Sequence, residues 1–405
     1  MAGSGPDGGP GTGLRVAVVG GGAVGVTAAH DLAVAGAAVT LFEKGDLASG
    51  ASGRAAGVLY DAYAEDVDAA VGARALERFR ELSRSAADGD GNGDSGDPEF
   101  AFTECPYVML AREGDDDLAE AVAGAAERMR THGRAVETLD GDALASRFPS
   151  LASDDVTVAA VASNAGWTDP ASYVEAVAEH AERAGVEIRE GSRVAVSTTP
   201  TGVTAADEAP VTRRFDAVVV AAGAQTKRLL AEAGIAIPLK PYRVQALVSG
   251  REYDGPMWYD ASAGAYARPH PAGLLAGDGT EPVEADPDDW DRVADDWFRE
   301  SVSETLRDRA DHDPAVERAW AGLCTATPDG DPLLGEIADG VFVAAGWQGH
   351  GFMRAPATGE AVAAQVLGEE APVEGIEAFD PGRFDGDEEF EISEGMTVEA
   401  DERRD

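Results

Sequence analysis

Val-Ala-Val-Val-Gly-Gly-Gly-Ala-Val-Gly, residues 16–25, predicts a buried strand that turns through glycines into a helix. Gly20, Gly22 and Gly25 stand in the G-x-G-x-x-G register. The first glycine allows a tight turn, the second lets the backbone approach a pyrophosphate, and the third lets the helix pack closely on the strand. The free N–H groups and the positive dipole of the helix N-terminus then favour phosphate.

A second apolar run follows the helical stretch and ends in an acid, Val-Thr-Leu-Phe-Glu at residues 39–43. Glu43 lies 18 residues after Gly25, which is close to the spacing expected for a carboxylate that binds a ribose hydroxyl. Together the two runs predict a βαβ unit that binds a dinucleotide.

Composition limits the classes of protein that the chain can represent. It has 405 residues, which is enough for two domains, and a formal net charge of −43. Such an acidic surface repels nucleic acid and anionic membranes, and it is typical of proteins kept soluble in high salt, although an acidic partner-binding role is an alternative. Two cysteines, no metal motif, no apolar span and no signal peptide favour a cytoplasmic protein.

Buried strands followed by glycines recur along the chain, at residues 215–223 and 340–351. Helices are expected at 66–85, 115–132, 140–148, 169–184, 286–309 and 354–367, and strands of a separate antiparallel sheet at 242–248 and 266–275. The fold class predicted is α/β, with a three-layer nucleotide domain and a second, largely antiparallel domain. Because nucleotide-binding segments return near the end of the chain, they suggest a flavin enclosed by several separate segments.

These segments resemble, in order, those of the FAD-dependent D-amino-acid oxidase superfamily, and in particular its sarcosine oxidase, dimethylglycine dehydrogenase and glycine oxidase branch. The resemblance covers roughly residues 14–373. It implies an FAD-binding domain at 14–60, 150–240 and 320–373 and a substrate domain at 61–149 and 241–319. Residues 1–13 are expected to be a disordered tail, and 380–405 an acidic tail that is also expected to be disordered.

The resemblance also implies which residues bind FAD. These are Gly20, Gly21, Gly22, Ala23, Val24, Gly25, Glu43, Lys44, Ser49, Ser52, Gly53, Arg54, Ala55, Ala56, Gly57, Val194, Ala222, Gly223, Gly346, Gly349, His350, Gly351, Phe352 and Met353. Small residues let the backbone approach a ring system, and Ser and Arg side chains satisfy phosphate oxygens.

Several positions depart from the family pattern and limit the prediction of substrate. The flavin-linking cysteine of monomeric sarcosine oxidases corresponds to Gly322, so FAD is expected to be non-covalent. Cys324 stands where glycine and D-amino-acid oxidases carry a carboxylate-binding arginine. The lysine that assists the oxygen reaction corresponds to Leu275, and the lysine after Gly-His-Gly-Phe corresponds to Met353.

The catalytic candidates are Arg268, as a replacement carboxylate-binding residue, with Tyr266, Gln348 and His350. Arg268 also fits an ordinary strand arginine, and His350 fits a structural hydrogen-bonding residue. The reaction expected is oxidation of a C–N bond in a small amino acid or N-methylated amine, by hydride transfer to flavin. Alternatives are a non-catalytic or subunit-type flavoprotein of a larger dehydrogenase and a nicotinamide-dependent Rossmann dehydrogenase. The sequence leaves open the substrate, the oligomeric state and the acceptor, which is oxygen, an electron-transfer protein or a quinone.

Overall fold

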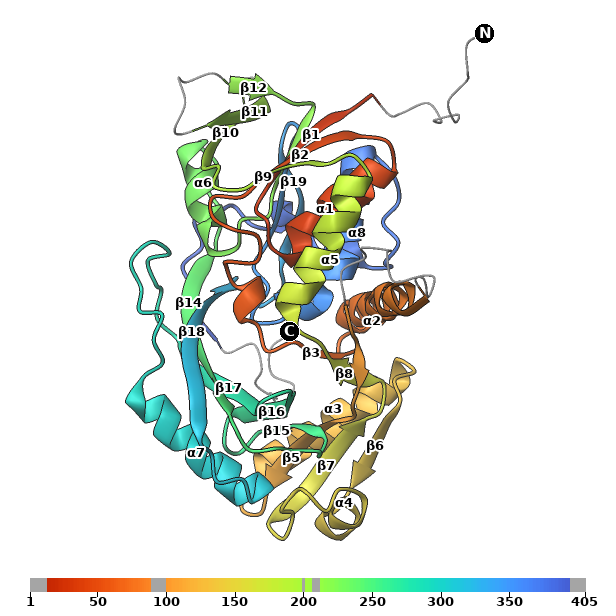
Figure 1. Ribbon diagram of the computed structural model, residues 1–405, viewed down its shortest axis with the longest axis vertical. Helices are drawn as coiled ribbons and strands as arrows, with labels where there is room; N and C mark the ends of the chain where they lie inside the picture. The colour runs from red at the N-terminus through yellow and green to blue at the C-terminus, as the bar shows by residue number, and fades with distance from the viewer. Residues whose placement is uncertain (1–12, 89–99, 199–200, 206–211, 394–405) are drawn as a thin grey trace.

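The computed structural model describes residues 13–88, 100–198, 201–205 and 212–393 (Figure 1). One end of the molecule holds a parallel sheet covered by helices, and the other end holds a large, mostly antiparallel sheet. The predicted α/β class with a separate antiparallel sheet is confirmed.

The nucleotide end is built on a six-stranded sheet that begins with the strand of the glycine fingerprint. Five strands run parallel because helices connect them, and the sixth closes one edge in the antiparallel direction. The order is β19 (Leu333–Ala338), β20 (Val341–Ala345), β13 (Ala217–Val220), β1 (Arg15–Val19), β2 (Ala38–Phe42) and β9 (Glu187–Arg189).

Both faces of this sheet are covered, which explains why its strands read as continuous apolar runs. Val16 and Val18 of β1 pack in the cluster that contains the helices, whereas Ala17 and Val19 pack in the cluster on the opposite face. The first layer contains α1 (Ala23–Val34), α2 (Asp66–Asp88), α5 (Pro170–Arg183) and α8 (Gly351–Leu367). The second contains β10 (Val194–Thr198), β11 (Thr201–Ala205), β12 (Thr212–Arg214) and α6 (Thr226–Glu232).

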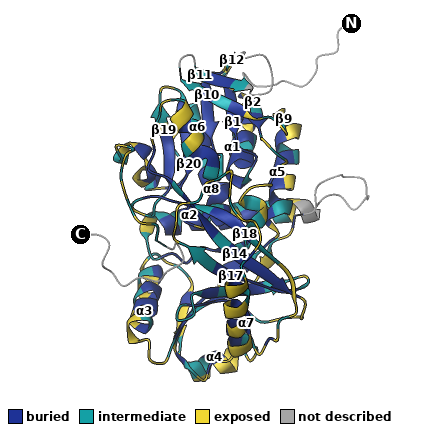
Figure 2. Ribbon diagram, turned by 90° about the vertical axis from the view of Figure 1, so that its left-hand side faces the viewer, coloured by how far each residue is buried: buried dark blue, intermediate teal, exposed yellow. Residues whose placement is uncertain are grey.

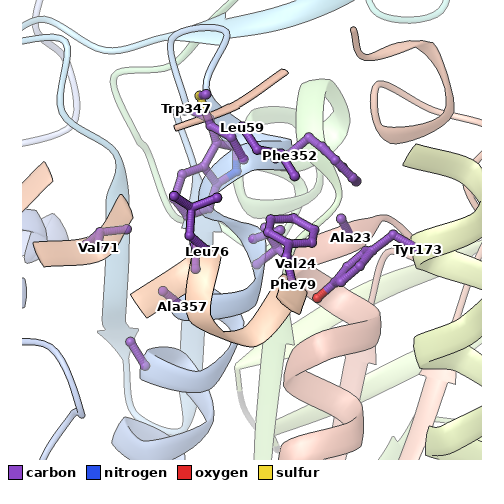
Figure 3. Close-up of a cluster of buried hydrophobic side chains, with 14 of the residues drawn as sticks. Ala23, Val24, Leu59, Val71, Leu76, Phe79, Tyr173, Trp347, Phe352 and Ala357 are labelled. Atoms are coloured by element: carbon purple, nitrogen blue, oxygen red, sulfur yellow. The ribbon is translucent and has the colours of Figure 1, made fainter. Parts of the chain in front are cut away.

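An aromatic cluster joins the helical layer (Figure 3). The ring of Phe79 on α2 lies 4.9 Å from that of Tyr173 on α5 and 5.5 Å from that of Phe352 on α8. Trp347 lies in the same group of side chains. The turn that precedes α8 is therefore anchored to helices from distant parts of the sequence.

The second end is an eight-stranded sheet in which only β15 and β5 pair in parallel. Helices α3 (Asp116–Thr131), α4 (Gly141–Arg147) and α7 (Asp296–Ala310) pack against it, and Figure 2 shows exposed residues along α7. The strand order is β18 (Val316–Ala326), β14 (Lys240–Ser249), β17 (Gly273–Glu281), β16 (Ala265–His270), β15 (Met257–Asp260), β5 (Tyr107–Arg112), β7 (Val156–Ala162) and β6 (Val136–Leu139). A small sheet of β3 (Val58–Tyr60), β8 (Ala165–Trp167) and β4 (Thr103–Glu104) lies near α2 (Figure 1).

Two strands lie in the large sheet although their residues fall in segments that were expected to form the FAD-binding domain. β7 lies between β5 and β6, and β18 pairs with β14, so parts of the expected FAD-binding segments belong to the large sheet. The helix expected at 286–309 is also shorter, because α7 begins at Asp296. The preceding residues 282–295, which we call the strap, contain Pro282 and Pro287. In the strap, Glu284 pairs with Lys227 of α6, and Asp288 accepts a hydrogen bond from Gln225, the residue before α6.

The acidic tail expected to be disordered is partly ordered. Pro381–Arg383 forms a short 3-10 helix, and the carbonyl of Phe390 accepts a hydrogen bond from Lys240 Nζ. Residues 1–12, 89–99 and 394–405, which include most of the expected N-terminal tail, lie outside the described residues. Among the helices that the structure describes, none has both the length and the apolar character needed to cross a membrane.

Candidate functional site

A cavity of about 580 Å³ lies where the carboxyl ends of the parallel strands meet the large sheet. Most of the predicted FAD-binding residues line it, although they come from six separate runs of the chain. The lining ones are Gly20, Gly21, Gly22, Ala23, Val24, Glu43, Lys44, Ser49, Ser52, Arg54, Ala55, Ala56, Gly57, Val194, Ala222, Gly223, Gly349, His350, Gly351, Phe352 and Met353. Gly25, Gly53 and Gly346 do not line the cavity.

The glycine turn has the geometry expected of a phosphate-binding turn. Gly20 has a φ of 118°, and a Cβ there would lie 2.3 Å from the Ala221 carbonyl oxygen. A Cβ at Gly25 would lie 2.0 Å from the Gly20 carbonyl oxygen, so this residue serves helix packing. The Ala23 amide donates to Ser52 Oγ at 2.9 Å, which joins the helix N-terminus to the loop at residues 49–57.

Glu43 lies beside this turn at the end of β2. Its Oε2 accepts from the Gly21 amide and its Oε1 from the Gly45 amide, both at 2.8 Å. These bonds hold the carboxylate at the cavity wall, and each oxygen keeps a second lone pair for a hydroxyl.

Positive charge gathers on this part of the cavity in a strongly acidic chain. Lys44, Arg54, Arg193 and Arg292 all line it. Burial, together with the charges of Arg292 and Arg318, lowers the pKa of Arg54, which donates to the Ser49 and Gly50 carbonyls. Such a concentration of cations suits a pyrophosphate.

The returning turn, residues 346–351, brings the N-terminus of α8 to the cavity. Gln348 adopts a φ of 48°, and its amide donates to the Thr325 carbonyl at 2.9 Å. His350 is 8 % exposed; burial and the nearby charge of Arg354 lower its pKa to about 3. The imidazole is therefore neutral near neutral pH, and the positive end of a 17-residue helix follows it.

A buried ion pair that sequence reasoning missed supports this turn. Arg354 Nη1 lies 2.7 Å from Asp68 Oδ1, and both side chains are less than a tenth exposed. The guanidinium also lies over the Tyr63 ring, whose edge contacts the His350 ring. Arg354, the residue after Met353, therefore places a positive charge close to the turn. Its carboxylate partner Asp68 lies on α2, far away in the sequence.

The large sheet contributes a different wall, which we call the substrate wall: Tyr242, Gln245, Tyr266, Asp278 and Cys324. Tyr242 and Cys324 pair across β14 and β18. Burial raises the pKa of the Cys324 thiol to about 12, and it also raises the pKa of the Tyr266 phenol. Asp278 and Gln245 were missed by sequence reasoning; the only signal was an acid between two glycines, Gly277-Asp-Gly279, within a strand pattern.

Two predicted catalytic residues have other contacts. Arg268 is 3 % exposed and does not line the cavity; it donates to the Ala56 and Pro269 carbonyls and lies over Trp167. Burial lowers its pKa to about 10. Gln348 lines the cavity, but its Nε2 donates to the Ser393 carbonyl at 2.5 Å. The hydrogen bonds of Arg268 and of Gln348 Nε2 thus go to backbone carbonyls and not toward a substrate.

Four tyrosines line the cavity, Tyr60, Tyr107, Tyr242 and Tyr266, and the rings of Tyr60 and Tyr107 stack at 4.7 Å. Tyr63 and Tyr259 do not line it. Within the described ranges, no group of His, Cys, Asp and Glu side chains is arranged to hold a metal ion.

Comparison with known proteins shows the family. Residues 15–365 match the family model described as FAD dependent oxidoreductase (DAO). The chain is 27 % identical to a glycine oxidase of Bacillus licheniformis over 380 residues, which cover 89 % of this chain and 95 % of that protein. It is also 27 % identical to a 4-methylaminobutanoate oxidase (formaldehyde-forming) of Paenarthrobacter nicotinovorans, covering 93 % of this chain and 46 % of that protein.

Among solved structures, the L-proline dehydrogenase of P. horikoshii superposes with a TM-score of 0.80 at 26 % identity, covering 93 % of this chain and 98 % of that one. The chain belongs to the FAD-dependent oxidoreductase family and is an enzyme that uses FAD. This result favours FAD over the nicotinamide cofactor that the glycine fingerprint alone allows.

Proposed function

We propose that this FAD-dependent oxidoreductase oxidises a C–N bond of a small amine or amino acid, of the sarcosine, dimethylglycine, glycine or D-amino-acid class. The observation that carries the proposal is a single cavity bounded by the glycine turn, the returning turn and the substrate wall. Relatives named as glycine and 4-methylaminobutanoate oxidases support the amine assignment.

The residues fit FAD. Gly20, Gly22 and the α1 N-terminus would hold the pyrophosphate, Glu43 the adenosine ribose, and the returning turn the flavin ring. When bound, FAD supplies the hydride acceptor for the carbon next to the substrate nitrogen.

The protein's own side chains would bind the substrate and exclude water. Tyr60 and Tyr107 form a stacked apolar surface, and Tyr242 and Tyr266 also line the cavity. Burial raises the pKa of the Tyr266 phenol, which therefore stays protonated near neutral pH. His350 is neutral and can donate or accept one hydrogen bond without repelling a positively charged amine. The α8 N-terminus would stabilise negative charge that develops on the ring beside it.

Non-covalent attachment belongs to the same proposal. Cys324 lines the cavity, but its thiol is held protonated, and Gly322 occupies the expected attachment position. Thiolate is the nucleophilic form of cysteine, so a covalent bond to the ring is disfavoured.

The proposal is tested by anaerobic bleaching of the FAD-loaded protein with sarcosine, dimethylglycine, glycine, D-alanine and L-proline, with lactate as the control. We expect at least one amine to bleach the flavin and lactate to leave it oxidised. Bleaching by lactate alone would refute the amine assignment. Turnover by the isolated chain, followed with oxygen and with an artificial electron acceptor, separates an independent enzyme from a subunit-type flavoprotein.

A further inference from the structure

The strap is fixed to the large sheet by its backbone. In Figure 1 it is the loop that rises from the start of α7 beside β14 and β18. The Ala285 amide donates to the Pro241 carbonyl at 2.8 Å, and the Arg292 carbonyl accepts from the Ala321 amide at 2.9 Å. Because Pro241 belongs to β14 and Ala321 to β18, the strap has a defined position on the edge of this sheet.

Side chains tie the same strap to the nucleotide end of the molecule. Glu284 pairs with Lys227 of α6 at 2.7 Å. Asp288 accepts from Gln225 Nε2 at 2.9 Å and pairs with Arg228 of α6. Gln225 itself lines the cavity. The ion pairs are largely exposed, so each stabilises the contact only weakly, and they can separate while the backbone bonds to the large sheet stay in place.

The strap presents its cation to the cavity and keeps its carboxylates out of it. Pro287, Trp290 and Arg292 line the cavity. Within the described residues, the Arg292 guanidinium forms no ion pair; it lies over the Trp290 ring, 4.8 Å from the centroid. The carboxylates of the strap, which do not line the cavity, belong to Glu284, Asp286, Asp288, Asp289, Asp291 and Asp295. An acidic segment thus contributes a positive charge to the cavity wall.

Arg292 joins a group of like charges that an anion would stabilise. Burial lowers the pKa of Lys44; Asp288 opposes this shift, whereas Arg193 and Arg292 add to it. Burial, followed by the charge of Arg292, also lowers the pKa of Arg54. Arg292 therefore lies close enough to two predicted FAD-binding residues to repel their charges. This repulsion is unfavourable unless an anion such as a pyrophosphate binds among them.

We propose that the strap acts as a clasp over the cofactor, in which Arg292 binds the FAD pyrophosphate while Glu284 and Asp288 hold the strap against α6. The proposal rests on FAD as the cofactor and is independent of which substrate is oxidised. The glycine turn and the α1 N-terminus would bind the same pyrophosphate from the nucleotide end. FAD would leave after the contacts with α6 separate, so these contacts set the rate of FAD release.

The first experiment tests the phosphate contact. Apoprotein is titrated with FAD, and free FAD is measured after ultrafiltration. Arg292→Gln should weaken FAD binding by about fivefold or more, and Arg292→Lys, which keeps the charge, should lose less. Arg307→Gln is the matched control, because Arg307 is an exposed arginine of α7 that does not line the cavity. An unchanged FAD affinity in Arg292→Gln would overturn the proposal, whatever happens to turnover.

The second experiment tests the ties to α6. FAD-loaded protein is diluted, and the FAD released is followed over time. The double variant Glu284→Gln/Asp288→Asn should release FAD about threefold faster or more. Loss of two negative charges would by itself favour an anion and slow its release, so faster release reports the lost ties. Asp289→Asn removes an exposed charge from the same strap and should not accelerate release.

A charge exchange adds a test of the pairing itself. Glu284→Lys alone should accelerate release, and adding Lys227→Glu to the same chain should restore the original rate. Release at the unaltered rate from both the double variant and Glu284→Lys would overturn the clasp. If the double variant does not fold, Glu284→Gln and Asp288→Asn are measured singly with the same expectation. Tight FAD binding without oxidation of any amine would refute the proposed function and leave the clasp intact.

Discussion

Replacement of His350 by glutamine should change how the stability of the protein depends on pH. The buried imidazole has a pKa of about 3 in the folded chain, against an ordinary value of 6.5. Below pH 6.5 the unfolded chain therefore binds a proton that the folded chain does not bind until the pH approaches 3. Stability rises with pH wherever the unfolded state binds more protons, so this contribution is complete above pH 6.5 and is lost on acidification.

The size of the effect follows from the same values. One pH unit corresponds to about 1.4 kcal/mol, so at about pH 5, which is about 1.5 units below the ordinary pKa, His350 destabilises the folded chain by roughly 2 kcal/mol. His350→Gln removes this term. Many carboxylates titrate in the same range, but they do so equally in both proteins, and the comparison cancels them.

The assay is denaturant unfolding of the unaltered protein, His350→Gln and His180→Gln at about pH 7.5 and pH 5 in molar salt. His180, which is partly exposed on α5, is the control for loss of a histidine. The unaltered protein and His180→Gln should lose about 2 kcal/mol more than His350→Gln between the two pH values. An equal loss in all three would refute the conclusion that His350 is held neutral by its surroundings.

Three further predictions follow from the buried ion pair, the cavity thiol and the net charge. Asp68→Asn should lower the free energy of unfolding by about 3–5 kcal/mol, because it leaves Arg354 buried without its carboxylate. Adding Arg354→Met to the same chain should restore much of that loss. If denaturant unfolding shows that the losses of the two single variants simply add, the ion pair does not have this role. Acid precipitation should release flavin into the supernatant, since the Cys324 thiol stays protonated; a yellow pellet would show a covalent bond. Because the net charge is −43, the thermal midpoint should rise by several degrees from dilute buffer to molar salt, and an unchanged midpoint would show that self-repulsion is unimportant.

The nucleotide half of the site was predictable because its geometry is local. Gly20, Gly22 and Gly25 lie within one turn, and Glu43 follows at a spacing fixed by one helix and one strand. Ser52 could be placed near the turn, but its acceptance of the Ala23 amide becomes visible only in the fold.

The substrate half depends on pairings between distant strands, which a single sequence does not specify. Arg268 lies only two residues after Tyr266 on β16, but two strand residues span about 6–7 Å, and its guanidinium donates to the Ala56 carbonyl instead of lining the cavity. Asp278 enters the site through a register shift between β14 and β17. The helix predicted at 286–309 included part of the strap, whereas the strap is not helical and its side chains contact Gln225 and Lys227 instead.

The order of the strands in the parallel sheet has a consequence for synthesis on the ribosome. β1, which precedes the other described strands, pairs with β13, and β13 pairs with β20, more than 300 residues after β1. The returning turn and α8 come later still, and α8 packs on α1. The nascent chain therefore cannot complete its cofactor site until α8 has been translated, and the part of α1 that packs on α8 stays uncovered until then. We therefore expect FAD to bind tightly only after residues 346–353 have been made, since these residues complete the cavity.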